Sequence, residues 1–244
     1  MEKNLFREVY KQVCGLALKD CPPSSLSGLL HGYLSVYSMV RVYPWLEDEY
    51  GSLWDIHERI REIARVIQEL LKDKDLPVDT RAGYVVDLMD AYLLYSDVKF
   101  LDTALDAAYE ILIPKGSDKI VLPCRTPNIC RLLCNCYYFT REEENIQLAK
   151  SLVTEILGLS KKITCDEVIV WSEAICVYEN IIGEMDIKEC ERLLEEYTRL
   201  DASVKQVRDE QVAYFYQNRG NILVMSRVFD FCAKREFDTC DKMF

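Results

Sequence analysis

Four cysteines lie close together in one short stretch of the chain, and thiolates are common ligands of zinc. They are Cys124, Cys130, Cys134 and Cys136. The stretch lacks the pair of cysteines with two residues between them that is typical of structural zinc sites, and on a helix Cys136 would point about 200° away from Cys134. Two interpretations stay open. The spacing favours small apolar side chains that fill a helix seam, and the other interpretation is a metal or redox site.

The chain contains two histidines, so a Ser-His-Asp or Cys-His arrangement would have to use His31 or His57. His57 is flanked by charged residues and is expected at the surface. His31 lies between Gly28 and Gly32, where a helix can admit a close neighbour or a ligand. For both histidines, a hydrogen-bonded side chain in the core or at the surface is the simpler interpretation. The phosphate-binding, nucleophile-elbow and zinc-protease motifs are absent from the sequence.

Carboxylates offer a further possible chemistry. Asp87 and Asp90 are three residues apart, so a helix places them on one face, near Tyr84 and Tyr92 in sequence. Glu173 falls on the equivalent helix of a later segment. Two carboxylates beside aromatic rings suit glycoside hydrolysis if these helices line a cavity and one carboxyl has a raised pKa. The simpler interpretation is a solvated acidic face.

Amide and guanidinium groups occur at similar positions on the expected helices. Amide, aromatic and charged groups on one helical face suit recognition of a peptide backbone or a sugar. The predicted ligand-binding residues are Tyr84, Asp87, Asn128, Arg131, Asn135, Glu173, Gln217 and Arg219. The alternative is ordinary packing of tyrosines with amides that face solvent.

Helical periodicity determines which elements would position these residues. The apolar residues near the N-terminus follow the helical period and predict a helix within residues 1–20. Later segments share one plan, a helix, a short turn and a second helix, with an offset of about 45 residues between similar positions. Thr126 and Pro127 predict a helix start by capping and by the first-turn preference of proline. The predicted hairpins cover approximately residues 26–71, 80–113, 126–158, 166–200 and 205–238.

Composition limits the class of protein. The formal net charge is −11 and no cluster of Lys and Arg occurs, which disfavours binding to nucleic acid or to an anionic membrane. The N-terminal residues follow a helical period and contain charges, so we expect no signal peptide there, and no run of about 18 apolar residues occurs in the sequence. The 11 cysteines are an odd number, which does not suit a complete set of disulfides. We therefore expect reduced thiols and a cytoplasmic protein.

Two sequence stretches resemble α/α-toroid proteins. Residues 100–112 (FLDTALDAAYEIL) look like the hairpins of lanthionine synthetase C-like cyclases and six-hairpin glycosidases. Residues 24–43, through Gly28, His31 and Gly32, resemble the glycine-containing helix starts of the cyclase group. The resemblance extends in pattern over residues 26–200 and implies a ring of hairpins with the first helices inside. The cyclases bind zinc through a Trp-Cys pair and a Cys-His pair, and this chain has neither.

The sequence therefore predicts an all-α fold in one helical-repeat domain, residues 1–244. About five antiparallel αα-hairpins would stack as an incomplete α/α toroid or as a solenoid of the tetratricopeptide type. The predicted function is a non-catalytic module that holds a peptide or protein segment on a concave face. The alternative is an α/α-toroid enzyme acting on a carbohydrate or a modified peptide, with Asp87, Asp90 or Glu173 as acid or base. The predicted binding module implies no cofactor and no metal ion. Zinc-dependent thiol chemistry is a third hypothesis.

Overall fold

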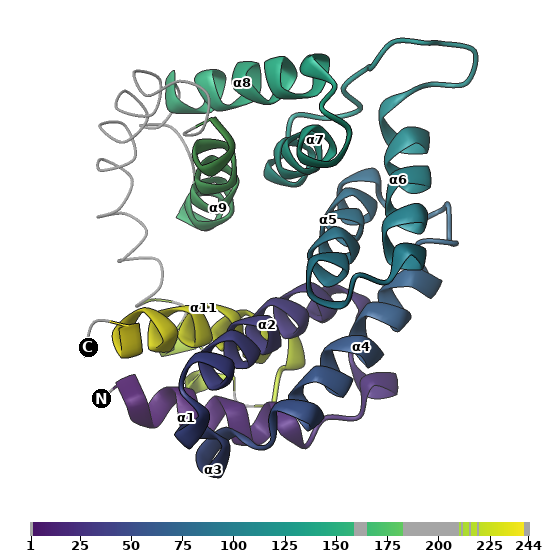
Figure 1. The fold of residues 1–244 in the computed structure, drawn as a ribbon. Coiled ribbons are helices and arrows are strands. Elements are labelled where there is room, and N and C mark those ends of the chain that lie inside the picture. The colour runs from purple at the N-terminus through teal and green to yellow at the C-terminus, as the bar shows by residue number, and fades with distance from the viewer. Residues whose placement is uncertain are drawn as a thin grey trace. The chain divides into compact units, whose positions relative to one another are not determined.

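Every regular element of the computed structural model is a helix within the residues that it describes, which are 2–158, 165–182, 210, 212–214, 216–218 and 220–241 (Figure 1). The prediction of an all-α fold is confirmed for these residues. Contacts between residues divide the chain into two compact units. The first comprises Met1–Lys72 and Gln211–Phe244, and the second comprises Asp73–Glu210. No described helix is both long enough and apolar enough to cross a bilayer.

The first unit combines the N-terminal helices with a helix from the C-terminal part of the chain. Its helical elements are, in chain order, α1 (Glu2–Cys14), η1 (Leu18–Asp20), η2 (Pro23–Ser25), α2 (Leu26–Val42), η3 (Pro44–Leu46), α3 (Glu47–Tyr50), α4 (Leu53–Leu70) and α11 (Ile222–Asp241). Helix α2 packs against α4 and, more extensively, against α11, which also packs against α1. The two ends of the chain therefore contribute to one core.

Helix α4 illustrates how the local sequence sets these elements. Ser52 caps its N-terminus, because the Ser52 hydroxyl accepts a hydrogen bond from the Asp55 amide at 3.1 Å. A cap of this kind stabilises a helix by about 1 kcal/mol. The isoleucines that follow the helical period are each at most 2% exposed, namely Ile56, Ile60, Ile63 and Ile67. Their burial, at about 2 kcal/mol for each side chain, makes this the core face of α4.

Two glycines allow α2 and α11 to approach each other closely. A Cβ atom added at Gly28 would lie 2.9 Å from the backbone oxygen of Ser226, and one added at Gly32 would lie 2.4 Å from Cδ1 of Phe229. Carbon atoms do not pack at such distances, so α11 could not lie where it does against larger residues. The sequence left open whether a neighbour or a ligand lies beside these glycines, and the structure places α11 there.

The second unit contains pairs of helices that follow one another along the chain. Its described helices are α5 (Val78–Tyr95), α6 (Val98–Leu112), α7 (Pro127–Thr140), α8 (Glu143–Gly158) and α9 (Cys165–Ile182). Helix α5 packs against α6 and α7, and α7 packs against α8 and α9. The helices α5, α7 and α9 therefore lie in a row, with α6 packed on α5 and α8 packed on α7 (Figure 1). The second helix of the fourth predicted hairpin and the start of the fifth fall on residues 183–209, which lie outside the described residues.

The N-terminus of α7 is where local sequence signals predicted it. The Thr126 hydroxyl accepts a hydrogen bond from the Ile129 amide at 3.4 Å, and Pro127 occupies the first helical position. The helix ends at Thr140, and Arg141 follows in the left-handed conformation with φ of 62°. The predicted helix start at Thr126 and Pro127 is confirmed. It fixes the positions of the polar residues that α7 presents toward α5.

Candidate functional site

The candidate site is the contact between α5 and α7, which carry most of the polar residues that the sequence singled out. Near the N-termini of the two helices, Asn128 in α7 donates hydrogen bonds from Nδ2 to the backbone oxygen and to Oδ2 of Asp79 in α5, at 3.3 and 3.1 Å. Gly83 lies beside this amide, and a Cβ atom there would be in ordinary van der Waals contact with Asn128 Nδ2 at 3.4 Å. The Asn128 amide is therefore engaged in joining the two helices.

Arg131 and Asp90 form a second polar link between the helices. Nη2 of Arg131 lies 3.9 Å from Oδ2 of Asp90, and the two side chains are 13% and 30% exposed. At this distance the contact is an ion pair without a short hydrogen bond. A guanidinium and a carboxylate are thus positioned together where solvent still reaches both.

Tyr84 and Asp87 lie in the interior of the structure instead of on its surface. Tyr84 is 2% exposed and Asp87 is 1% exposed. Burial, and to a lesser extent the negative charge of Asp87, raises the pKa of Tyr84 to about 12. Because neither side chain is accessible in this structure, a substrate could not contact Asp87 without a local opening. The geometry therefore does not present Asp87 and Asp90 as an accessible catalytic pair.

The remaining predicted residues lie at separate places. Asn135 in α7 and Glu173 in α9 are partly exposed on neighbouring helices. Gln217 is exposed and belongs to the first unit. Arg219 lies outside the described residues. Within the second unit, the predicted binding residues Asn128, Arg131 and Asn135 thus lie on one helix, α7, and Glu173 lies on the neighbouring helix α9. Of the three, Arg131 is the residue that contacts Asp90.

Three of the four cysteines in residues 124–136 pack in the interior of the second unit. Cys130 and Cys134 are fully buried in α7, Cys136 is 4% exposed, and Cys124 is partly exposed. The pKa of the Cys134 thiol is raised mainly by a hydrogen bond with Cys130 and secondly by burial. The pKa of Cys136 is raised to about 12, mainly by burial and secondly by the charge of Glu142. Within the described ranges, no three His, Cys, Asp or Glu side chains are grouped so that they could hold a metal ion. The apolar surroundings favour neutral thiols that act as small core residues.

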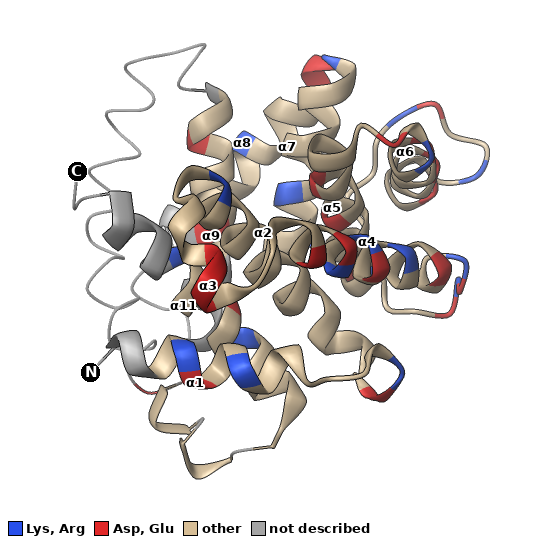
Figure 2. Cartoon of the chain, turned by 60° about the horizontal axis from the view of Figure 1, so that its bottom comes forward, with Lys and Arg blue, Asp and Glu red and all other residues tan. Residues whose placement is uncertain are grey.

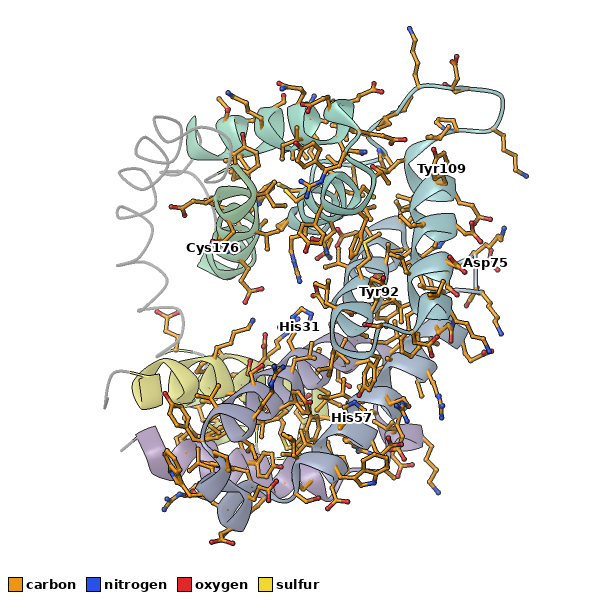
Figure 3. All side chains as sticks on the ribbon, viewed as in Figure 1. His31, His57, Asp75, Tyr92, Tyr109 and Cys176 are labelled. Atoms are coloured by element: carbon orange, nitrogen blue, oxygen red, sulfur yellow. The ribbon has the colours of Figure 1, made fainter. Side chains whose placement is uncertain are left out.

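The two histidines lie on different helices of the first unit (Figure 3). His31 is partly buried in α2. His57 in α4 lies between two aromatic rings, with centroids 5.8 Å from Tyr37 and 6.1 Å from Trp54. The expected surface position of His57 holds in part, because the residue is partly exposed.

One buried charged residue was not predicted from the sequence. Arg81 in α5, with a side chain 9% exposed, donates a hydrogen bond from Nη2 to Oε2 of Glu110 in α6 at 3.0 Å. Lys74 binds the other oxygen of Glu110 at 2.7 Å. Arg81 is the one positively charged residue of α5, which was the available signal, but its partner lies 29 residues away.

A small pocket in the second unit was also not visible in the sequence. It is partly open to solvent and lies where α6, the C-terminal end of α7 and the start of α8 meet. Its walls are largely apolar and include Tyr109 and Cys136, with Glu142 and Asn145 as polar residues. The residues from 113 to 126 must fold back for Ile113 and Ile120 to reach this wall, and no local pattern predicts that path. Asp87 and Glu173 do not line it.

Comparisons with protein-family models, with curated proteins and with solved structures give no match to this chain.

Proposed function

We propose that this chain is a non-catalytic helical-repeat module that holds a peptide or protein segment on the face formed by α5, α7 and α9. The observation that carries the proposal is the pair of Arg131 and Asp90, whose opposite charges lie 3.9 Å apart between α5 and α7 with both side chains reached by solvent. A guanidinium offers several N–H donors and a carboxylate offers acceptors, so the pair provides both kinds of group that a peptide segment can bind.

The row of helices gives this pair a suitable setting. The helices α5, α7 and α9 lie side by side and follow one another as the first members of successive pairs (Figure 1). Asn135 extends the polar stripe of Arg131 along α7, and Glu173 adds a carboxylate on α9. Amides offer both donors and acceptors, which is what recognition of an extended backbone requires. This supports a binding surface that crosses several helices, as in helical-repeat proteins.

The proposal also covers how the helical hairpins are stacked. About five αα-hairpins would stack through nearest-neighbour contacts, as an incomplete α/α toroid or as a solenoid of the tetratricopeptide type. The packing of α5 on α6, α7 on α8 and α5 on α7 supports this for the second unit. The partner would be a peptide or protein in the cytoplasm, and the net charge of −11 favours neither nucleic acid nor an anionic membrane as a partner.

A matched pair of variants tests the proposed face. Arg131→Gln with Glu173→Gln removes one cation and one anion from it, whereas Lys99→Gln with Asp102→Asn removes the same charges from exposed positions of α6. The wild-type protein would be screened on an array of random synthetic dodecapeptides, and the selected sequences would be measured with all three proteins by calorimetry.

We expect the face variant to lose about tenfold or more in affinity for the selected peptides, because charge-assisted hydrogen bonds contribute about 1.5–3 kcal/mol each. The control variant should bind as the wild type does. Equal affinity of all three proteins for every selected peptide would contradict the proposed face, and the absence of any selected peptide would contradict peptide binding.

A further inference from the structure

Two tryptophans are largely exposed at the corner between α2 and α4 in the first unit. Trp45 is 60% exposed and Trp54 is 67% exposed, whereas Trp171 in the second unit is 5% exposed. We call the segment 42–58, which contains both exposed indoles, the tryptophan corner. Single exposed apolar residues are common, but two largely exposed indoles within one short segment are unusual.

Contacts with the rest of the unit hold the tryptophan corner in place. The Leu53 amide donates a hydrogen bond to Oε1 of Glu47 at 3.1 Å, which ties the start of α4 to α3. Tyr50 is 4% exposed and its ring lies 5.2 Å from that of Phe6 in α1. The corner is therefore anchored to the core, and its exposed indoles require little ordering when a partner binds.

The aromatic surface continues from the corner onto the contact between α2 and α4. The rings of Trp54 and His57 are stacked with an interplanar angle of 26° and a centroid distance of 6.1 Å. The ring of His57 also lies near that of Tyr37 in α2, with a centroid distance of 5.8 Å. Three consecutive rings thus present π-faces and edges at this part of the first unit.

The charge of the tryptophan corner is entirely negative. Segment 42–58 contains five Asp and Glu residues and neither Lys nor Arg. Two of the five carboxylates have cationic partners, since Glu49 pairs with Arg7 and Glu58 with Arg61. The others, Glu47, Asp48 and Asp55, are exposed and form no ion pair with any Lys or Arg that the structure describes. Figure 2 shows α3, which contains Glu47 and Asp48, in red.

We propose that the tryptophan corner binds an arginine-containing cationic segment of a partner protein. A guanidinium can stack on an exposed indole while its N–H groups donate hydrogen bonds to a carboxylate, so the indoles and the carboxylates of the corner both suit an arginine side chain. An anionic membrane surface would be repelled by these carboxylates, and two copies of the corner would repel each other. The inference concerns the first unit and does not depend on the function proposed for the second.

The test uses defined peptides and the full chain. The probe is an acetylated, amidated peptide of four Arg-Gly repeats, compared with the same peptide carrying citrulline, which keeps the planar shape of arginine without its charge. One variant set is Trp45→Ala, Trp54→Ala and their combination. The other is Glu47→Gln with Asp48→Asn and Asp55→Asn, matched by Asp102→Asn with Asp106→Asn and Asp118→Asn, which removes three exposed charges elsewhere.

We expect each tryptophan substitution to weaken binding of the arginine peptide about two- to fivefold, the range for cation–π contacts at exposed sites. The corner charge variant should lose about tenfold at low salt, the matched charge variant should lose less than twofold, and the citrulline peptide should not bind. Circular dichroism should be unchanged, because both indoles are exposed. Sedimentation velocity would detect a second copy of the chain as the occupant, and binding to vesicles containing phosphatidylserine would detect a membrane.

Several outcomes would overturn the proposal. Equal losses in the corner and matched charge variants would show attraction to the net charge alone. Equal binding of the citrulline and arginine peptides would exclude recognition of the guanidinium charge. A dimer that dissociates when both tryptophans are replaced, or vesicle binding that requires them, would assign the surface to a second copy or to a membrane.

Discussion

Gly32 in α2 lies directly against the ring of Phe229 in α11, so close that a Cβ atom at Gly32 would be 2.4 Å from Cδ1 of Phe229. Phe229 is fully buried and its ring also stacks on that of Phe6 in α1 at 6.3 Å. The contact joins helices from the two ends of the chain within one core. We predict that Gly32→Ala destabilises the first unit by about 1–3 kcal/mol, the range for overpacking a core, despite the higher helix propensity of alanine. Urea denaturation followed by far-UV circular dichroism measures this change.

Two further variants isolate the steric cause. Gly15→Ala should be close to neutral, since the added Cβ would have no neighbour nearer than 3.6 Å. Combining Gly32→Ala with Phe229→Leu should cost less than the sum of the single changes, because the smaller side chain releases the clash. Strict additivity of the two changes would contradict direct contact between the positions.

Features that depend on residues close together in the chain were predictable from the sequence, whereas contacts between distant residues were not. Thr126 and Pro127 act within one helical turn, so the start of α7 was predictable. Gly28 and Gly32 indicated a close approach, but their neighbours, Ser226 and Phe229, are nearly 200 residues away and carry no matching local pattern.

A similar limit applies to the candidate site. The spacing of Asp87 and Asp90 correctly implies one side of a helix, but it does not tell which of the two is covered by other helices. The structure leaves Asp90 30% exposed and Asp87 1% exposed. The link between Asp79 and Asn128 was missed for a related reason, since it depends on the side-by-side packing of α5 and α7.

The cysteines of α7 should be protected from alkylation in the folded protein. Cys130, Cys134 and Cys136 are at most 4% exposed, and their surroundings raise the pKa of Cys134 and Cys136, whereas Cys14 is exposed. Iodoacetamide at pH 8, with peptide mapping by mass spectrometry, should label Cys14 at least about 100-fold faster, because the thiolate is the reactive form. In urea the rates should converge. Faster labelling of these three cysteines after addition of a chelator would instead indicate a metal site.

The ion pair of Arg81 and Glu110 should matter more for stability than the neighbouring pair of Lys74 and Glu110. The hydrogen bond from Lys74 is the main cause that lowers the pKa of Glu110, but the Lys74 side chain is 68% exposed and that of Arg81 only 9% exposed. Glu110→Gln leaves a buried guanidinium without its carboxylate and should cost about 1–3 kcal/mol. Lys74→Gln, the control, should cost less than about 0.5 kcal/mol. Equal free energies of unfolding for the two variants would contradict this assignment.

Ionisation of Tyr84 should weaken the second unit at alkaline pH. Burial, together with the charge of Asp87, raises the pKa of Tyr84 from 10.0 to about 12 in the folded protein. Below pH 10 the phenol is neutral in both the folded and the unfolded chain, so its contribution to stability is complete. Between about pH 10 and 12 only the unfolded chain releases the proton, and the free energy of unfolding should therefore fall, by at most about 1.4 kcal/mol per pH unit. Tyr84→Phe should make this decline shallower, whereas Tyr92→Phe, at a partly exposed position of the same helix, should leave it as in the wild type. Urea unfolding at pH 9, 10 and 11 measures the three slopes, and an unchanged slope for Tyr84→Phe would show that the Tyr84 phenol is not held neutral by the fold.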